Sequence, residues 1–128
     1  MKTSLLAGRR VLVVEDDYLL GIDLAATLQG AGAEVIGPAS SVAEALDMLD
    51  PLPDVASLDV QLGDETSFPI ADELARRGIP FVFVTGSANT IPTSHGTRPI
   101  CHKPAPGHAV MSALADALTQ SAGANSSI

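Results

Sequence analysis

Short apolar runs alternate along the chain with longer stretches in which apolar residues recur at helical spacing. Five of the runs have the length and apolar character of buried strands: residues 10–14, 34–37, 55–58, 81–84 and 100–102. Helical patterns cover residues 18–29, 41–49 and 69–77, and a last helix begins near Pro106. Strands joined by helix-length connections form right-handed βαβ units. The pattern therefore predicts an α/β domain built on one parallel sheet.

Polar residues at the helix starts support these boundaries. Asp17 precedes the first helix and is typical of an N-cap residue, whose side chain accepts a hydrogen bond from the first turn. Ser41 and Glu44 have the spacing of a capping box at the start of the second helix. Both helices are therefore expected to begin directly after these caps.

Three segments depart from the alternating pattern. Residues 87–98 contain few apolar side chains, so we expect a loop or at most one helical turn where a fourth helix would otherwise lie. Residues 1–8 are expected to form a flexible N-terminus, and residues 120–128, rich in Ser, Ala, Gly and Asn, a disordered tail. The predicted folded domain therefore comprises residues 9–119.

Composition narrows the possible functions. The 128 residues suit one domain, and a formal net charge of −8 disfavours binding to nucleic acid. The longest apolar runs are far shorter than a membrane span, and the apolar part of residues 1–7 is too short for a signal peptide. The single cysteine, Cys101, cannot form an internal disulfide. We therefore expect a cytoplasmic protein that binds neither membranes nor nucleic acid.

Reactive side chains follow four of the predicted strands. Because the carboxyl ends of parallel strands meet at one edge of a sheet, these residues are expected to converge there. They are Glu15 and Asp16 after the first strand, Asp59 after the third, Thr85 after the fourth and Lys103 after the fifth. The chain contains just two lysines, so a lysine at a strand end is itself informative.

This set of groups suits phosphoryl transfer to a carboxylate. Clustered carboxylates repel one another unless a cation joins them, and their hard oxygens favour Mg²⁺. A carboxylate can also act as a nucleophile and form an acyl phosphate. We therefore expect Asp59 to attack phosphorus while Glu15 and Asp16 hold Mg²⁺. Lys103 and Thr85 would then stabilise the charge on the phosphoryl oxygens.

At these residues the sequence resembles the receiver domains of two-component response regulators. The matching segments are Val13-Val14-Glu15-Asp16-Asp17, Leu58-Asp59-Val60, Val84-Thr85-Gly86 and Lys103-Pro104. The resemblance extends over residues 10–118. Three further segments resemble single-domain receivers of the Phe-Ala-Thr-Gly-Tyr type, which are associated with HWE-family histidine kinases: residues 35–39, 43–46 and 78–86.

The resemblance implies a (βα)5 flavodoxin-like fold with strand order 2-1-3-4-5 and a short or missing fourth helix. It also implies a stand-alone response regulator that accepts a phosphoryl group on Asp59 and signals by protein contact or serves as a phosphate sink. Such a protein is not an enzyme in the usual sense. Its metal ligands would be Glu15, Asp16, Asp59 and the backbone carbonyl of Gln61. The implied partners are a histidine kinase of HWE type and a phosphotransfer protein, and the implied state is a monomer or weak dimer.

Three positions differ from the usual receiver pattern. The aromatic residue that commonly follows Thr-Gly is Ser87, and the one that commonly follows Lys-Pro is Ala105. The switch position three residues before the lysine, often Tyr or Phe, is Ile100. The groups needed for phosphorylation are all present, but the common coupling of threonine to a switch tyrosine cannot operate with isoleucine.

The same residues argue against several other functions. A haloacid-dehalogenase-type phosphatase also uses an aspartyl nucleophile, but it needs a second aspartate two residues later, where this chain has Gln61. The order of Cys101, His95, His102 and His108 matches no zinc-site spacing. A nucleotide-binding flavodoxin-like domain lacks support because no glycine-rich phosphate loop follows the first strand. The remaining alternative is a degenerate receiver that binds partners without being phosphorylated.

Overall fold

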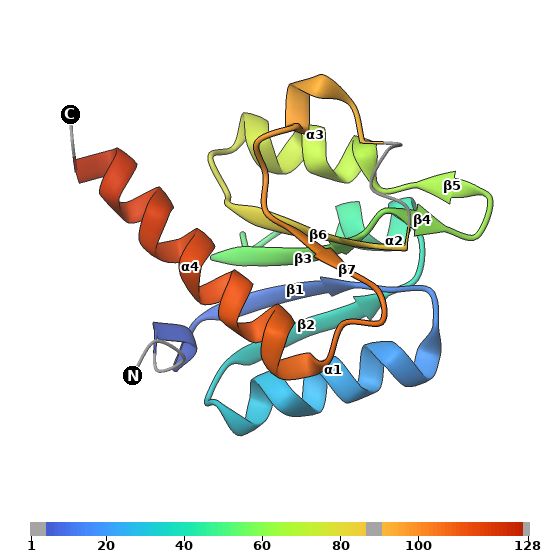
Figure 1. Cartoon of the computed structure of the whole chain (residues 1–128), viewed down its shortest axis with the longest axis horizontal. Coiled ribbons are helices and arrows are strands. Elements are labelled where there is room, and N and C mark those ends of the chain that lie inside the picture. The colour runs from blue at the N-terminus through green and yellow to red at the C-terminus, as the bar shows by residue number, and fades with distance from the viewer. Residues whose placement is uncertain (1–4, 87–90, 127–128) are drawn as a thin grey trace.

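The computed structural model describes residues 5–86 and 91–126, which form a five-stranded parallel sheet with helices on both faces (Figure 1). The sheet strands are β1 (Arg10–Val14), β2 (Glu34–Ala39), β3 (Val55–Asp59), β6 (Phe81–Thr85) and β7 (Ile100–His102). Their order is β2-β1-β3-β6-β7, and every neighbouring pair is parallel. This is the predicted order 2-1-3-4-5, so both the fold class and the topology are confirmed.

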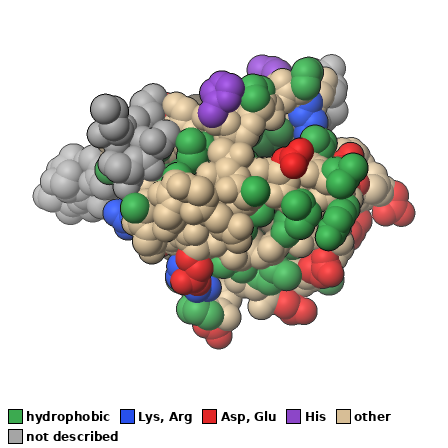
Figure 2. All heavy atoms as spheres, turned by 90° about the horizontal axis from the view of Figure 1, so that it is seen from below, with side chains coloured by type: hydrophobic (Ala, Val, Ile, Leu, Met, Phe, Trp, Pro, Cys, Tyr) green, Lys and Arg blue, Asp and Glu red, His purple; other side chains and the backbone are tan. Residues whose placement is uncertain are grey.

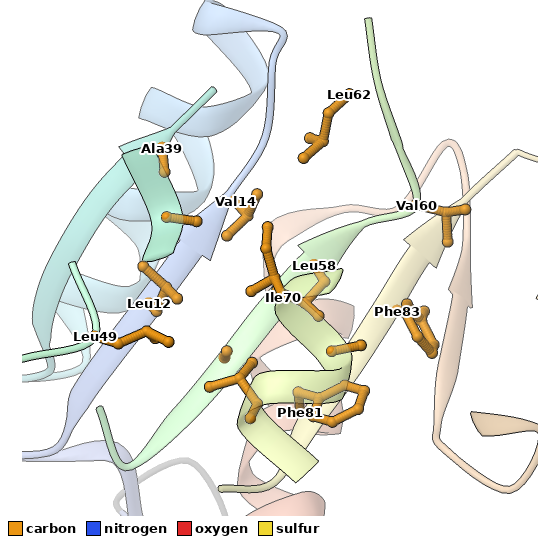
Figure 3. Packing of buried hydrophobic residues seen from close by; sticks show 14 residues of the cluster. Leu12, Val14, Ala39, Leu49, Leu58, Val60, Leu62, Ile70, Phe81 and Phe83 are labelled. Atoms are coloured by element: carbon orange, nitrogen blue, oxygen red, sulfur yellow. The ribbon is translucent and has the colours of Figure 1, made fainter. Parts of the chain in front are cut away.

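Two pairs of helices cover the sheet. α1 (Tyr18–Gly30) packs beside α4 (Gly107–Ser126) on one face, and α2 (Val42–Asp47) packs beside α3 (Phe68–Arg76) on the other (Figure 1). Alternate residues of a strand point to opposite faces. Leu12 and Leu58 accordingly enter the core under α2 and α3 (Figure 3). Val11 and Val55 enter the core under α1 and α4. Since both faces are covered, the central strands are mostly apolar, with buried Ser57 in β3 and polar residues at their carboxyl ends.

The predicted helix caps are present. The Asp17 carboxylate accepts a hydrogen bond from the Leu20 amide at 3.2 Å, and the Ser41 hydroxyl accepts one from the Glu44 amide at 3.2 Å. The Glu44 carboxylate reaches back to the amide and hydroxyl of Ser40, both at 2.8 Å, and so satisfies a donor just before the cap. Local polar spacing was therefore sufficient to locate these two helix starts.

At both chain ends the described residues differ from the predicted flexible N-terminus and disordered tail, while residues 1–4 and 127–128 lie outside the described part. Residues 5–8 of the predicted flexible N-terminus pack on the domain: Leu6 is fully buried, and the Gly8 amide donates to the Gly32 carbonyl at 2.8 Å. Burial of the apolar Leu6 side chain stabilises the folded state, and this holds residues 5–8 against the domain although their neighbours in sequence are polar. At the other end, α4 continues to Ser126 through the segment expected to be disordered. That segment contains alanines and no proline, so nothing in it forces the helix to stop.

Two short elements complete the chain. A two-stranded hairpin, β4 (Gln61–Leu62) and β5 (Glu65–Thr66), follows β3 and was not predicted. In the segment 87–98, residues 91–98 are described and contain one 3-10 turn, η3 (Thr93–His95). The expectation of no more than one helical turn is confirmed for these residues, and Ser87 lies outside the described part. No helix in the described part of the chain combines the length and apolar character needed to cross a bilayer.

Gly37 creates an irregularity in the pairing of β1 with β2, whose register shifts between Leu12 and Val14. Its φ of +101° favours glycine, and a Cβ at this position would lie 2.7 Å from both the Val13 carbonyl oxygen and the Ala39 nitrogen. Gly78 also has a positive φ, +73°, but no atom lies within 4 Å of the position its Cβ would take. Replacing Gly78 would therefore introduce backbone strain alone, whereas replacing Gly37 would add steric overlap.

We expect Gly37→Ala to lower the free energy of unfolding by clearly more than the roughly 1 kcal/mol expected from a positive φ alone. Gly78→Ala is the matched control and should show just the smaller cost. Urea denaturation of both variants measures the difference. Equal losses in the two variants would contradict the packing assigned to Gly37.

Candidate functional site

Three carboxylates gather at the carboxyl ends of β1 and β3. Oxygens of Glu15, Asp16 and Asp59 lie within 4.8 Å of one another. The cause is strand register: Val14 pairs with Leu58, so the residues that follow each of them emerge side by side. Glu15 and Asp59 are buried, whereas Asp16 is exposed. Of the side chains in the described part of the chain, these three form the group suited to holding a metal ion.

Lys103 joins two of these carboxylates. Its Nζ lies 3.1 Å from Glu15 Oε1 and 3.0 Å from Asp59 Oδ1. The lysine follows β7, and its backbone amide donates to the Thr85 carbonyl at 2.8 Å. The same hydrogen bond places Thr85, at the end of β6, directly beside the lysine. The structure thus brings together the predicted Glu15, Asp16, Asp59 and Lys103, with buried Thr85 at the adjacent strand end.

The β4–β5 hairpin holds Asp16 in place. The Gly63 amide donates to Asp16 Oδ2 at 2.8 Å. Gly63 and Asp64 form the two-residue turn of the hairpin, and Gly63 has a φ of +62°. The Gln61 side chain closes the turn by donating to the carbonyls of Gly63 and Glu65 at 2.8 and 3.0 Å. A Gly-Asp pair between two short runs is a hairpin signal, and it could have revealed this element in advance.

The position of Gln61 agrees with its predicted role without testing it. Gln61 is the first residue of β4, two residues after Asp59, and its side chain points to the hairpin turn. Its backbone carbonyl as a metal ligand therefore stays a prediction. Asp17 was expected to be a cap, and its carboxylate does cap α1 while its amide donates to Glu15 Oε2 at 3.1 Å. That second bond helps to orient Glu15 toward the cluster.

The electrostatics of the cluster are unbalanced. Burial, together with the nearby Glu15 carboxylate, raises the pKa of Asp59 to about 7, although Lys103 acts in the opposite direction. Burial also acts to lower the pKa of Lys103, but its contacts with Asp59 and Glu15 outweigh this and raise the pKa. For Asp16, burial is outweighed by the Gly63 amide and its acidic neighbours, and the pKa is lowered. One lysine therefore offsets the repulsion of the carboxylates incompletely.

A cavity of about 710 Å³ opens beside the cluster, between α1 and the turn that leads into α4. Its inner end is formed by Glu15, Asp59 and Lys103, and its walls are mainly apolar. The apolar lining residues are Val14, Leu20, Leu24, Val84, Pro104, Ala105, Pro106 and Val110. The absence of a large side chain at Ala105 contributes to this open space.

Exposed apolar side chains lie on α1 next to the cavity. Tyr18 and Leu19 are 75% and 71% exposed, and Leu20 and Ile22 are also exposed. Figure 2 shows hydrophobic side chains gathered on this face with acidic side chains around them. An apolar patch rimmed by polar residues is typical of a surface that binds another protein.

Comparison with known proteins identifies relatives along most of the chain, although no protein-family model matches it. SdrG from Sphingomonas melonis, a solved structure, is 37% identical, and the match covers 90% of this chain and 98% of SdrG with a TM-score of 0.74. The receiver (REC) domain of the response regulator PhyR from Erythrobacter litoralis is 23% identical, which supports the fold alone. That match covers 88% of this chain and 92% of the PhyR domain with a TM-score of 0.76.

A curated relative matches a smaller part. The transcriptional regulatory protein PdtaR of Mycobacterium tuberculosis is 35% identical over 79 residues, which is 60% of this chain and 38% of PdtaR. The matched part of the chain thus spans little more than a third of that regulator.

The raised pKa of Asp59 predicts a stability effect with a definite pH dependence. Between the ordinary aspartate pKa of 3.8 and the folded value of about 7, the folded protein binds the Asp59 proton more tightly than the unfolded chain. The stability that Asp59 contributes is therefore fully present below about pH 4 and is lost as the pH rises through 7. Asp59→Asn cannot ionise, so it avoids this loss.

We expect metal-free Asp59→Asn to be more stable than the wild type above pH 7 by about 1–3 kcal/mol. A rise in pKa from 3.8 to about 7 corresponds to roughly 4 kcal/mol, and solvent screening at the edge of the sheet lowers this figure. The difference should shrink toward pH 4. Urea denaturation across this pH range in the presence of a chelator provides the measurement. Asp64→Asn, in the exposed hairpin turn, is the control. A stability difference that does not vary with pH would contradict the assignment.

Proposed function

Because the chain belongs to the family of response-regulator receiver domains, we propose that it accepts a phosphoryl group on Asp59 from a histidine kinase. Members of this family are two-component signalling proteins rather than enzymes in the usual sense. The observation that carries the proposal is the position of Asp59, buried between Glu15 and Lys103 with its Oδ1 3.0 Å from Lys103 Nζ. This contact with a cation supports the role of the Asp59 carboxylate as the nucleophile.

The chemical step is an in-line displacement at phosphorus. A carboxylate oxygen of Asp59 forms a new P–O bond to the phosphoryl group of a phosphohistidine, and the P–N bond breaks. The imidazole leaves with the electron pair of that bond and takes up a proton. Lys103 then faces the new negative charge, and the Thr85 hydroxyl is assigned as a hydrogen-bond donor to a phosphoryl oxygen. Gly86 adds no side chain, and no atom lies within 4 Å of where its Cβ would be.

The acidic cluster suits Mg²⁺. Glu15, Asp16 and Asp59 offer hard oxygen ligands within a small volume, and Lys103 alone leaves them with excess negative charge. These carboxylates, together with the Gln61 backbone carbonyl, are the proposed ligands. When bound, Mg²⁺ would neutralise charge on the phosphoryl oxygens. The Gly63 amide would hold Asp16 in position for this purpose, because it donates to Asp16 Oδ2 at 2.8 Å.

The proposed docking face for the kinase consists of the exposed α1 side chains Tyr18, Leu19, Leu20 and Ile22 and the cavity next to Asp59. The cavity ends at Asp59, which supports the approach of a donor phosphohistidine from this side. The likeness of several segments to the Phe-Ala-Thr-Gly-Tyr receivers supports a kinase of HWE type. A stand-alone receiver would then pass its signal by protein contact, transfer phosphate to a phosphotransfer protein or act as a phosphate sink.

We expect the wild-type protein to gain one phosphoryl group from acetyl phosphate in a Mg²⁺-dependent reaction, and Asp59→Asn to gain none. The reason is that Asp59 ends the central strand β3, between Glu15 and Lys103, whereas Glu15 is assigned to the metal ion. Intact-mass spectrometry measures the gain. The control is Asp54→Asn, since Asp54 bonds the Arg10 amide at 2.8 Å, away from the cluster. Equal uptake by wild type and Asp59→Asn would refute the assignment.

Asp16→Asn should weaken Mg²⁺ binding by at least about tenfold, because it removes a charged ligand from the cluster. Calorimetric titration measures the affinity. Asp17→Asn is the matched control: it changes the neighbouring carboxylate, which caps α1, and asparagine is an equally good cap. If Asp16→Asn and Asp17→Asn bind Mg²⁺ as tightly as the wild type, the ion does not use this cluster.

A further inference from the structure

His95 enters the core of the domain, which is unusual for a residue in such a polar segment. It lies in η3 and is 4% exposed, whereas His102 and His108 are exposed. The described part of its segment lies against α3 (Figure 1). An imidazole is therefore a principal attachment of this segment to the rest of the protein.

Aromatic rings surround the imidazole. The Phe81 ring lies 5.6 Å from it at an interplanar angle of 72°, and the Phe83 ring lies 6.0 Å from it at 66°. These are edge-to-face contacts, in which the positive ring edge meets the negative ring face. Phe68 packs on Phe83 in the same way at 6.1 Å, so the cluster includes every phenylalanine of the chain. Figure 3 shows Phe81 and Phe83 along β6.

One hydrogen bond explains why the buried ring is a histidine. His95 Nε2 lies 2.7 Å from Asp72 Oδ1 on α3. An ionised carboxylate can only accept, so Nε2 is the donor in this hydrogen bond. Nδ1 is buried without a hydrogen-bond partner. An apolar side chain would fill this space without burying an unpaired nitrogen, so the advantage of histidine is its bond to Asp72.

The remaining charged neighbour is Arg98. Its guanidinium lies 4.3 Å above the Phe81 ring, and its backbone amide donates to the His95 carbonyl at 3.1 Å. Asp72 faces the ring nitrogen from α3, and Arg98 encloses the cluster from the residues that follow η3. The imidazole itself is held by α3 through Asp72 and by β6 through Phe81 and Phe83, so both hydrogen bonding and packing orient it.

The cluster is continuous with the site through β6. Phe81, Phe83 and Thr85 alternate along the strand and so point to the same face of the sheet. Ile100 on β7 pairs with Phe83 on β6 and packs against the same core, but its side chain has no polar atom. His95 therefore supplies a hydrogen-bonding ring next to the strand that ends in Thr85.

We propose that His95 is a positioning residue for Thr85. Its ring packs on Phe83, which lies on the same strand as Thr85, and its hydrogen bond to Asp72 connects this strand to α3. The proposal rests on the proposed function, because it concerns the movement of Thr85 when Asp59 carries a phosphoryl group. A shift of Thr85 moves the β6 face on which His95 packs, and the ring either carries Asp72 with it or breaks that hydrogen bond. The face formed by α3 and η3 would thus report the state of Asp59.

The first test follows the His95 ring by ¹⁵N NMR, with signals assigned through His95→Phe. Beryllium fluoride with Mg²⁺ serves as a stable substitute for the phosphoryl group. We expect the Nε2–H tautomer in the free protein and a clear change in the ring ¹⁵N shifts when beryllium fluoride binds. In Asp72→Asn the change should be much smaller, whereas Asp47→Asn, an exposed carboxylate on α2, should respond like the wild type.

The second test measures phosphate uptake from acetyl phosphate. Asp72→Asn should change the rate by about two- to tenfold, the range expected for residues that couple two sites. Asp72 is 71% exposed, so this variant tests the link even if His95→Phe fails to fold. Uptake by the wild type without any response of the His95 ring, or with equal rates in Asp72→Asn, would overturn this inference alone. A wild type that takes up no phosphate would overturn the proposed function and this inference with it.

Discussion

The electrostatic balance at the carboxyl edge of the sheet constrains the rest of the site. Parallel pairing of β1 with β3 forces Glu15 and Asp59 to emerge together, and burial prevents water from screening their repulsion. Lys103 contacts both carboxylates and offsets part of this cost. Because one ammonium cannot balance three carboxylates, the metal-free domain retains excess negative charge that a divalent cation can neutralise. The same imbalance that destabilises the free protein thus favours a metal ion at this position.

Position in the sheet also explains why the two faces differ in character. The face under α1 and α4 is incompletely filled near the site, where small and cyclic side chains such as Ala105 and Pro106 border the cavity. The face under α2 and α3 is filled by the phenylalanines and His95. An open apolar cavity suits transient contact with a partner, whereas a close-packed aromatic cluster transmits displacement because it resists deformation. In these proposals, approach to Asp59 and output from it therefore use opposite faces of the sheet.

Small elements outside the main sheet determine the geometry of the site. The β4–β5 hairpin contributes Leu62 to the core, and its Gly63 amide binds the exposed Asp16 carboxylate. The backbone bond from Lys103 to Thr85 likewise fixes two functional residues through main-chain atoms. Substitutions that preserve every charged side chain could therefore still disturb the site by shifting the backbone of these short segments.

The sequence by itself determined the order and type of the main elements and the residues expected at the carboxyl edge. The strand order followed from the resemblance to receiver domains. These features depend on local signals, such as the apolar runs before Glu15 and Asp59 and the caps at Asp17 and Ser41. Tertiary structure alone decided the docking of Leu6, the bond from Gly63 to Asp16 and the entry of His95 into the aromatic cluster. Gly63 and Asp16 are 47 residues apart, and His95 and Asp72 are 23 apart. Such contacts form because the folded sheet brings distant segments together, and no local periodicity or spacing encodes which of them will meet.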